Sequence, residues 1–205
     1  MSKRFDLLVF DWDGTLLDSA GAIVNAIRAA CRDLNHPEPS DGQARHVIGL
    51  GLSDALRLAV PDLSDDKIPL MVERYRHHYL SCDHDLQLFD GVSELVAELH
   101  ASGFILAVAT GKSRRGLNRA MEYCGLGRFF SATRCADECL SKPHPQMLNE
   151  LMSEFSLPPA RTLMIGDTTH DMQMAINAGV TGLAVAYGAH SADVRAVSAA
   201  LTVDS

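Results

Sequence analysis

The chain has 205 residues, 47% of them hydrophobic and 21% charged, a balance that supports a packed core and argues against disorder. At about 150 residues per domain, this length corresponds to one domain with a sizeable insertion or to two small domains. The formal net charge is −8, without a block of like charges. Because nucleic acids and anionic membranes do not attract a negative surface, the charge argues against both as general partners.

Other features of the chain predict a cytoplasmic protein that does not enter a membrane. No apolar run approaches the roughly 18 residues that a bilayer span needs. The apolar stretch near the start is short and broken by Asp6 and Asp11, so we do not expect a signal peptide. The five cysteines are scattered, odd in number and without a CxxC pair, which predicts reduced thiols. No pattern in the sequence predicts an oligomeric state.

Four short, continuous apolar runs predict strands that are covered on both faces. These runs are 7–10, 104–110, 162–166 and 182–186. Helical patterns lie near 91–102, 113–124, 143–155 and 169–178. Strands that alternate with helices predict an α/β fold, with a Rossmann-like parallel sheet and helices on both of its faces. We also predict a weaker strand near 129–133, and a tail, 189–205, that forms a last helix or frays.

The segment 19–81 interrupts this alternation, because it carries helical patterns and no convincing strand. The helical patterns cover 19–34, 52–59 and 65–80. About 60 residues are too many for a loop inside a compact domain. We therefore predict an inserted α-helical cap domain at residues 18–84, called the cap below. The core domain then consists of residues 1–17 and 85–205.

Polar residues follow three of the four predicted strands, where active sites of open α/β sheets lie. They are Asp11, Asp13, Thr110, Gly111, Asp167 and Asp171. Positions two apart in an extended segment face the same way, so Asp11 and Asp13 can share one pocket. Four acids at one edge repel each other unless a cation holds them. Carboxylate oxygens together with a substrate phosphate suit Mg²⁺, which we predict as the cofactor.

Lys142 lies at the start of the predicted helix 143–155, at the same edge of the sheet by topology. A metal, a lysine, a threonine hydroxyl and backbone amides together suit a phosphoryl group. Asp11 can then act as the nucleophile and form an aspartyl-phosphate. Asp13 can protonate the leaving oxygen and afterwards deprotonate the hydrolytic water.

These segments amount to a resemblance to a known family. In order along the chain they are Asp11-Trp-Asp-Gly-Thr, Thr110-Gly111, Lys142-Pro-His-Pro and Gly166-Asp-Thr-Thr-His-Asp. They resemble the four motifs of the haloacid-dehalogenase superfamily, and the run GDTTHDMQMAINAG and the insertion with IGLGL resemble its phosphoglycolate-phosphatase-like branch. The resemblance implies a Mg²⁺-dependent phosphatase with a helical cap. The implied partner is a small phosphorylated metabolite, for which this branch suggests 2-phosphoglycolate.

The resemblance also implies a role for each matching residue. The side chains of Asp11 and Asp167 and the backbone carbonyl of Asp13 would hold the metal, and Asp171 would support the site, partly through water. Thr110, with the adjoining Gly111, and Lys142 would bind the phosphate. The chain departs from the family at Asp90, where proline is common, in a linker away from the chemistry.

Several alternatives share this fold. A phosphomutase of the β-phosphoglucomutase type retains both aspartates, so the motifs leave it open. A catalytically silent binding protein would be expected to lose one of the acids or Lys142. Family dehalogenases lack the second aspartate, so Asp13 argues against that activity. A phosphonate hydrolase needs a reactive cap lysine, and Lys67 has the sequence context of an exposed helix start.

The loop from Arg45 to Gly51 is our candidate for the part of the cap that faces the substrate. Gly49 and Gly51 let backbone amides approach a ligand closely. Arg45 can pair with a carboxylate on the leaving group, although an exposed residue at a helix end is an equally good interpretation. We expect residues 19–81 to move as a unit.

Four potential metal ligands lie near the end of the predicted cap. Their spacing does not match any standard zinc site, so we do not predict a metal there: His77, His78, Cys82 and His84.

Overall fold

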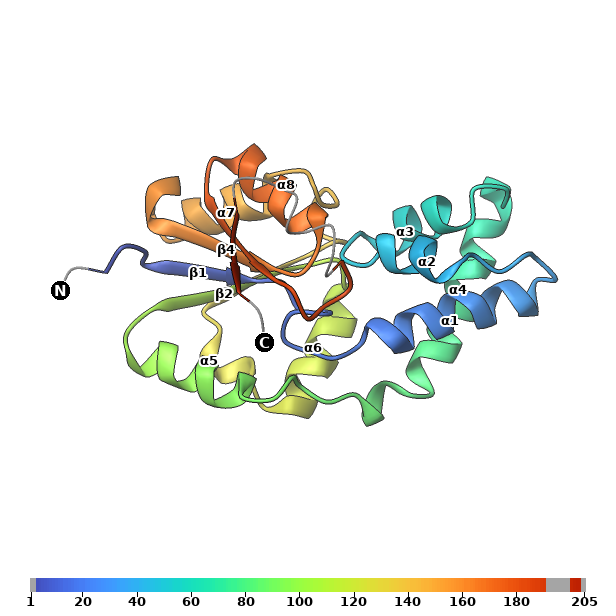
Figure 1. The fold of residues 1–205 in the computed structure, drawn as a ribbon, viewed down its shortest axis with the longest axis horizontal. Helices are drawn as coiled ribbons and strands as arrows, with labels where there is room; N and C mark the ends of the chain where they lie inside the picture. Colours follow the sequence, from blue (N-terminus) through green and yellow to red (C-terminus); the bar gives the residue numbers. More distant parts are fainter. Residues whose placement is uncertain (1–2, 191–199, 204–205) are drawn as a thin grey trace.

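The computed structural model describes residues 3–190 and 200–203. It contains an α/β core and a group of helices, α1–α4, that projects from one end of that core (Figure 1). The six strands form one sheet in the order β3-β2-β1-β4-β5-β6, and every pairing is parallel. The strands are β1 (Leu7–Phe10), β2 (Ile105–Thr110), β3 (Ala132–Cys135), β4 (Thr162–Gly166), β5 (Thr181–Val185) and β6 (Ala200–Val203). The predicted α/β fold with a parallel sheet is therefore confirmed.

Helices cover both faces of the sheet, as its continuous apolar strands require. Alternate residues of β1 face opposite sides: Leu8 and Phe10 belong to one core cluster with Val96, and Leu7 and Val9 belong to another with Leu148. Helices α5 and α6 lie below the sheet and α7 and α8 above it in Figure 1. Their bounds are α5 (Val92–Ala101), α6 (Arg114–Cys124), α7 (Gln146–Glu154) and α8 (Thr169–Ala178).

The strand order brings the functional motifs to one edge. β1 lies between β2 and β4, and its last residue, Phe10, is level with Val108 of β2 and Ile165 of β4. All three strands run in the same direction, so their carboxyl ends lie side by side. The residues that follow them, from Asp11, Thr110 and Asp167 onward, therefore meet at one place.

Two predicted elements have different bounds in the structure. The helix predicted at 143–155 begins only at Gln146, because residues that precede a proline avoid the helical conformation, and Pro143 and Pro145 both impose this. The strand predicted near 129–133 is displaced to 132–135, after a short 3-10 turn at Gly127–Phe129.

The helices of the cap have a hydrophobic cluster of their own, to which α1 contributes Ile27 and α4 contributes Met71. One of them, α2, was not predicted, although Ser40 and Gln43 form a capping box at its start. The helices are α1 (Ala20–Asp33), α2 (Asp41–His46), α3 (Leu52–Ala59) and α4 (Ile68–Leu80). The exact domain boundaries stay a prediction.

The tail differs from the prediction of a last helix at 189–205. Residues 200–203 form β6, which pairs with β5 and so satisfies backbone groups at the edge of the sheet. The segments 191–199 and 204–205 lie outside the described residues. Within the described residues, no helix is both long and apolar enough to cross a membrane.

Candidate active site

Three carboxylates converge at the ends of the central strands. Asp11 follows β1, Asp167 follows β4, and Asp171 lies in the first turn of α8. One oxygen atom from each lies within 4.8 Å of the other two. All three side chains are buried. The structure thus brings together three of the four acids that the sequence pointed to, from segments about 150 residues apart.

Lys142 joins this acidic cluster. Its Nζ lies 2.7 Å from Oδ1 of Asp11 and 2.7 Å from Oδ1 of Asp171. Burial opposes the charged ammonium, but the two carboxylates outweigh it and raise the pKa of Lys142. The side chain therefore stays charged, and it offsets only part of the negative charge of the three acids.

Burial and the remaining negative charge raise the pKa values of two of the carboxylates. Burial raises the pKa of Asp11 well above its usual range, and the charges of Asp171 and Asp167 add to this effect against the opposing charge of Lys142. Burial, together with the charge of Asp171, raises the pKa of Asp167 to about 7. The cluster thus favours proton uptake in the absence of another cation.

One atom of the cluster has the properties expected of both a metal ligand and a nucleophile. Oδ2 of Asp11 is buried and has no hydrogen-bond partner within the described residues. A buried polar atom without a partner is costly, and a cation that binds it removes that cost. Hard oxygen donors in excess over the local positive charge fit Mg²⁺. The residues present are therefore suited to this ion.

Asp167 is held by contacts that the sequence did not point to. Thr15 Oγ1 donates to Oδ1 at 2.8 Å, and the backbone N–H of Ala189 donates to Oδ2 at 2.7 Å. A Cβ atom at Gly14 or Gly188 would stand only 2.2 Å from Oδ2 of Asp167. Glycine is therefore required at both positions, because the loop that carries Gly14 and the loop that carries Gly188 both pack directly against this carboxylate.

Asp171 also closes the start of its own helix. The backbone N–H and the hydroxyl of Thr168 donate to Oδ2 of Asp171 at 3.1 and 2.6 Å, and Thr168 Oγ1 in turn accepts from the Asp171 N–H. This capping box leaves Oδ1 for Lys142. The motif therefore both starts α8 and fixes the third carboxylate.

The side chain of Asp13 lies apart from the other three acids. Its Oδ1 accepts from Ser19 Oγ at 2.6 Å and forms an ion pair with Lys112 Nζ at 3.0 Å. Lys112 also donates to the Tyr79 hydroxyl of α4 at 2.9 Å. Sequence reasoning did not select Lys112, although it directly follows Gly111. The side chains of Asp11 and Asp13 thus do not join one cluster, and the role of the Asp13 backbone carbonyl as a metal ligand stays a prediction.

The loop at residues 47–51 of the cap lies directly over this edge of the sheet. A Cβ atom at Gly111 would be 2.4 Å from the carbonyl oxygen of Leu50, and one at Gly49 would be 3.2 Å from Thr168 Oγ1. The N–H of Gly51 donates to Ser141 Oγ at 2.8 Å, next to Lys142. The loop and the acidic edge are thus in close contact, and Gly49 and Gly111 both lie where they meet.

Thr110 lies fully buried at the end of β2, where its hydroxyl accepts from the backbone N–H of Lys112 at 3.2 Å. The side chain of Arg45 does not enter the site. Its guanidinium pairs with Asp41 of the same helix at 2.8 Å, and its side chain is 39% exposed. This geometry favours the interpretation of Arg45 as an exposed residue at a helix end.

The histidines near the end of α4 do not form a common group. His78 pairs with Asp33 at 2.8 Å, and His84 pairs with Asp85 at 3.4 Å. Within the described residues, His77 and Cys82 do not belong to any cluster of metal-ligating side chains. This agrees with the absence of a standard zinc spacing.

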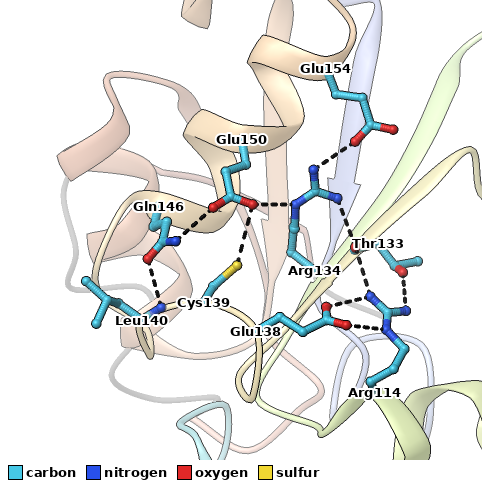
Figure 2. Close-up of polar contacts among 9 residues, drawn as sticks. All are labelled: Arg114, Thr133, Arg134, Glu138, Cys139, Leu140, Gln146, Glu150 and Glu154. Atoms are coloured by element: carbon cyan, nitrogen blue, oxygen red, sulfur yellow. Dashed lines mark hydrogen bonds and ion pairs between the residues drawn. The ribbon is translucent and has the colours of Figure 1, made fainter.

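Figure 2 shows how the loop that carries Lys142 is anchored on both sides. Arg134 of β3 binds Glu150 and Glu154 of α7 at 2.7 and 2.8 Å. Arg114 binds Glu138 at 2.7 Å, and the Gln146 side chain accepts from the N–H of Leu140 at 3.0 Å. These contacts fix the connection between β3 and α7 before and after Lys142.

A small cavity lies between the cap and the core. It measures about 110 Å³, and its wall includes Leu17, Tyr79, Lys112 and Arg119. Lys112 thus connects the cavity to the carboxylate of Asp13. The wall also includes Asp83, which pairs with Arg119 at 2.6 Å, so a small anionic molecule would meet Lys112 and the aromatic groups.

Comparisons with known proteins show which chains this one is similar to. The family model of haloacid dehalogenase-like hydrolases matches residues 8–185. A relative from Dickeya dadantii, named a probable phosphatase, IndB, is 37% identical over 97% of this chain and 89% of its own. The phosphoglycolate phosphatase of Vibrio cholerae is 33% identical over 91% of this chain and 86% of its own. A crystal structure of a predicted phosphoglycolate phosphatase from Haemophilus somnus covers 100% of this chain and 96% of that one, with a TM-score of 0.88 and 26% identity.

Proposed function

The chain belongs to the haloacid dehalogenase-like hydrolase family, and on this premise we propose that it is a Mg²⁺-dependent phosphatase that acts through an aspartyl-phosphate. The observation that carries the proposal is the buried Asp11, whose Oδ2 lacks a partner within the described residues while its Oδ1 is held by Lys142 at 2.7 Å. One oxygen is thus oriented, and the other is available to attack phosphorus.

In the first half-reaction, Oδ2 of Asp11 attacks the phosphorus atom, and the bond to the leaving oxygen breaks. Asp13 gives its proton to that oxygen, so the alcohol leaves in neutral form. Lys142 and the hydroxyl of Thr110 hold non-bridging oxygens of the phosphoryl group. Positioning and charge neutralisation supply most of the acceleration in such a transfer.

In the second half-reaction, Asp13 takes a proton from water, and the resulting oxygen attacks phosphorus. The bond to Asp11 breaks, inorganic phosphate leaves, and Asp11 is regenerated as a carboxylate. Ser19 and Lys112 hold the Asp13 carboxylate at 2.6 and 3.0 Å, which fixes the position of the group that takes this proton.

Mg²⁺ would be held by the side chains of Asp11 and Asp167 and the backbone carbonyl of Asp13, with support from Asp171. When bound, the ion supplies positive charge that neutralises the phosphoryl oxygens and the acidic cluster. The excess of carboxylates over ammonium groups and the raised pKa of Asp167, about 7, both support a requirement for this ion.

For the substrate, we propose a small phosphorylated acid such as 2-phosphoglycolate, met in the cytoplasm. Two observations support this choice. Relatives that are about one third identical to this chain are named phosphoglycolate phosphatase. The cavity of about 110 Å³ between the cap and the core has room for a leaving group of few atoms, and Lys112 in its wall can pair with a carboxylate.

The acids of the site are buried, so a substrate needs an opening. The loop 47–51 contacts Gly111, Thr168 and Ser141. We propose that the cap, residues 18–84, moves away from the core to admit the substrate and returns to exclude water.

The proposal is tested with a panel of phosphate monoesters that contains 2-phosphoglycolate, p-nitrophenyl phosphate and glucose 1-phosphate. Release of inorganic phosphate is measured with Mg²⁺, with EDTA, and with the Asp11→Asn variant as control. We expect release only from the wild type with Mg²⁺. Conversion of glucose 1-phosphate to an isomer without free phosphate would instead assign a phosphomutase. Equal release in EDTA would contradict the role of the metal.

A further inference from the structure

Three histidines from distant parts of the chain meet outside the acidic cluster. His46 ends α2 in the cap, His170 lies in the first turn of α8, and His190 follows β5 in the core. One ring nitrogen from each lies within 4.8 Å of the other two. The ring centroids are 5.3 to 5.4 Å apart in all three pairs.

We infer that His46, His170 and His190 form a binding site for a divalent transition-metal ion such as Zn²⁺ that bridges the cap and the core. Imidazole nitrogens are the ligands that zinc, copper and nickel prefer, and Mg²⁺ prefers oxygen. Three histidines with a fourth position left to water form a known tetrahedral arrangement of zinc. The site therefore differs in metal preference from the acidic cluster of Asp11, Asp167 and Asp171.

Backbone hydrogen bonds set the tautomers of two of the three rings. His170 Nε2 lies 2.7 Å from the carbonyl oxygen of His46, and His190 Nε2 lies 3.1 Å from that of Arg45. A carbonyl only accepts, so each Nε2 carries the proton and each Nδ1 carries a lone pair. Histidines that bind metals commonly donate their other N–H to a carbonyl in this way.

Binding needs a rotation of the His46 ring, because the rings of His46 and His190 are stacked with an interplanar angle of 8°. Tetrahedral zinc with bonds of about 2.0–2.1 Å places its nitrogen ligands about 3.4 Å apart, and here the nitrogens lie within 4.8 Å. His46 is exposed and can rotate toward the other two rings. Nδ1 of His190 accepts from the N–H of Thr169 at 3.1 Å and lies 3.3 Å from the Thr169 hydroxyl, and a bound metal would replace these contacts.

The position of the site gives it a mechanical consequence. His46 immediately precedes the loop 47–51 that contacts Gly111 and Thr168, and His170 immediately precedes Asp171. A metal held by both would tie the loop of the cap to the start of α8. It would therefore stabilise the closed arrangement of the two parts.

Direct binding measurements test this inference without reference to turnover. Zn²⁺ is titrated against a chromogenic chelator, with Mg²⁺ in large excess to fill the acidic cluster. Wild type should bind one tight equivalent of Zn²⁺. His46→Ala and His170→Ala should each weaken it at least about tenfold, whereas His100→Ala, at an exposed histidine of α5, should bind as wild type does.

Two further variants test where the ion binds and whether a loss of binding reflects unfolding. Asp167→Asn, which removes an oxygen ligand of the acidic cluster, should keep the tight Zn²⁺ equivalent. His46→Gln should lose it while circular dichroism remains that of the wild type. The inference is overturned if wild type binds no tight equivalent, if His46→Ala and His100→Ala bind alike, or if only Asp167→Asn abolishes binding. None of these outcomes bears on phosphatase activity, so the two proposals fail separately.

Discussion

Two lysines, the buried Lys142 and the largely buried Lys112, each hold one carboxylate at the edge of the sheet. Lys142 binds Asp11 at 2.7 Å, and Lys112 binds Asp13 at 3.0 Å. The first pair orients the nucleophile. The second pair orients the residue that moves the proton, and it also lies in the wall of the cavity proposed for the leaving group. Lys112 would therefore affect both the proton transfer by Asp13 and the recognition of the substrate.

We predict that Lys112→Met lowers kcat for every substrate, because Asp13 loses a charged partner. KM should rise roughly tenfold for 2-phosphoglycolate, since a hydrogen bond to a charged group contributes about 1.5 kcal/mol. KM for p-nitrophenyl phosphate, which lacks a carboxylate, should hardly change. Steady-state kinetics with both substrates measure this difference.

Lys67→Met is the matched control, because Lys67 is exposed in the cap. Its kinetics should equal those of the wild type. An equal rise in KM for both substrates in Lys112→Met would remove Lys112 from carboxylate recognition.

Single residues differ in how well the sequence predicted their surroundings. Asp11, Asp167 and Lys142 were placed together because each follows or precedes a regular element whose position in a parallel sheet is known. Thr15 and Lys112 were not selected, because hydroxyls and lysines are common and their contacts join distant segments. Arg45 carried a local signal, since Asp41 stands four residues earlier on the same helix, and that pair formed.

The loop 47–51 packs so closely against the residue after β2 that a side chain at Gly111 would clash with it. A Cβ atom at Gly111 would lie 2.4 Å from the carbonyl oxygen of Leu50 and 2.6 Å from that of Gly49. We predict that Gly111→Ala displaces the loop and lowers kcat/KM by about 100-fold, as a displacement of about 1 Å can. Kinetic assays and thermal unfolding of the variant measure both effects.

Gly42→Ala provides the control for that substitution. Gly42 also lies in the cap, within α2, and a Cβ atom there would meet nothing within 4 Å. Its activity should stay within about twofold of the wild type, with a stability gain of about 0.5–1 kcal/mol from replacing a helical glycine. Equal losses in both variants would mean that the contact at Gly111 does not govern the site.

Elements with a strong hydrophobic pattern were predicted well. The four apolar runs form β1, β2, β4 and β5, because a strand covered on both faces is apolar at nearly every position. Helix starts were less predictable: the two prolines after Lys142 were compatible with a first helical turn, yet they delayed α7 to Gln146. The edge strand β6 depends on pairing with β5, which no local pattern reveals.

At the scale of the whole molecule, the stability of the protein should depend on pH through the acidic cluster. The pKa of Asp167 is raised from 3.8 in the unfolded chain to about 7, so the folded protein binds the proton more tightly. This contribution to stability is complete below about pH 4 and is lost as the pH rises through 7. The metal-free protein should therefore lose stability from this group between those values.

Mg²⁺ should reverse that loss, because it binds the deprotonated carboxylates. We predict that the rise in Tm caused by Mg²⁺ is small near about pH 5 and large near about pH 8. Differential scanning calorimetry at the two pH values measures the rise. The Asp167→Asn variant should show little rise at either pH, and an equal rise in wild type at both would contradict the proposed role of Asp167.

The proposed mechanism depends on Asp11 as the nucleophile. Phosphate release from p-nitrophenyl phosphate, measured for the wild type and for Asp11→Asn side by side with Mg²⁺, tests this role. The amide keeps the shape of the side chain but does not attack phosphorus, so we predict a loss on the order of 10⁴-fold in kcat. The variant should remain folded by circular dichroism. A folded Asp11→Asn variant with activity within about tenfold of the wild type would contradict the covalent mechanism.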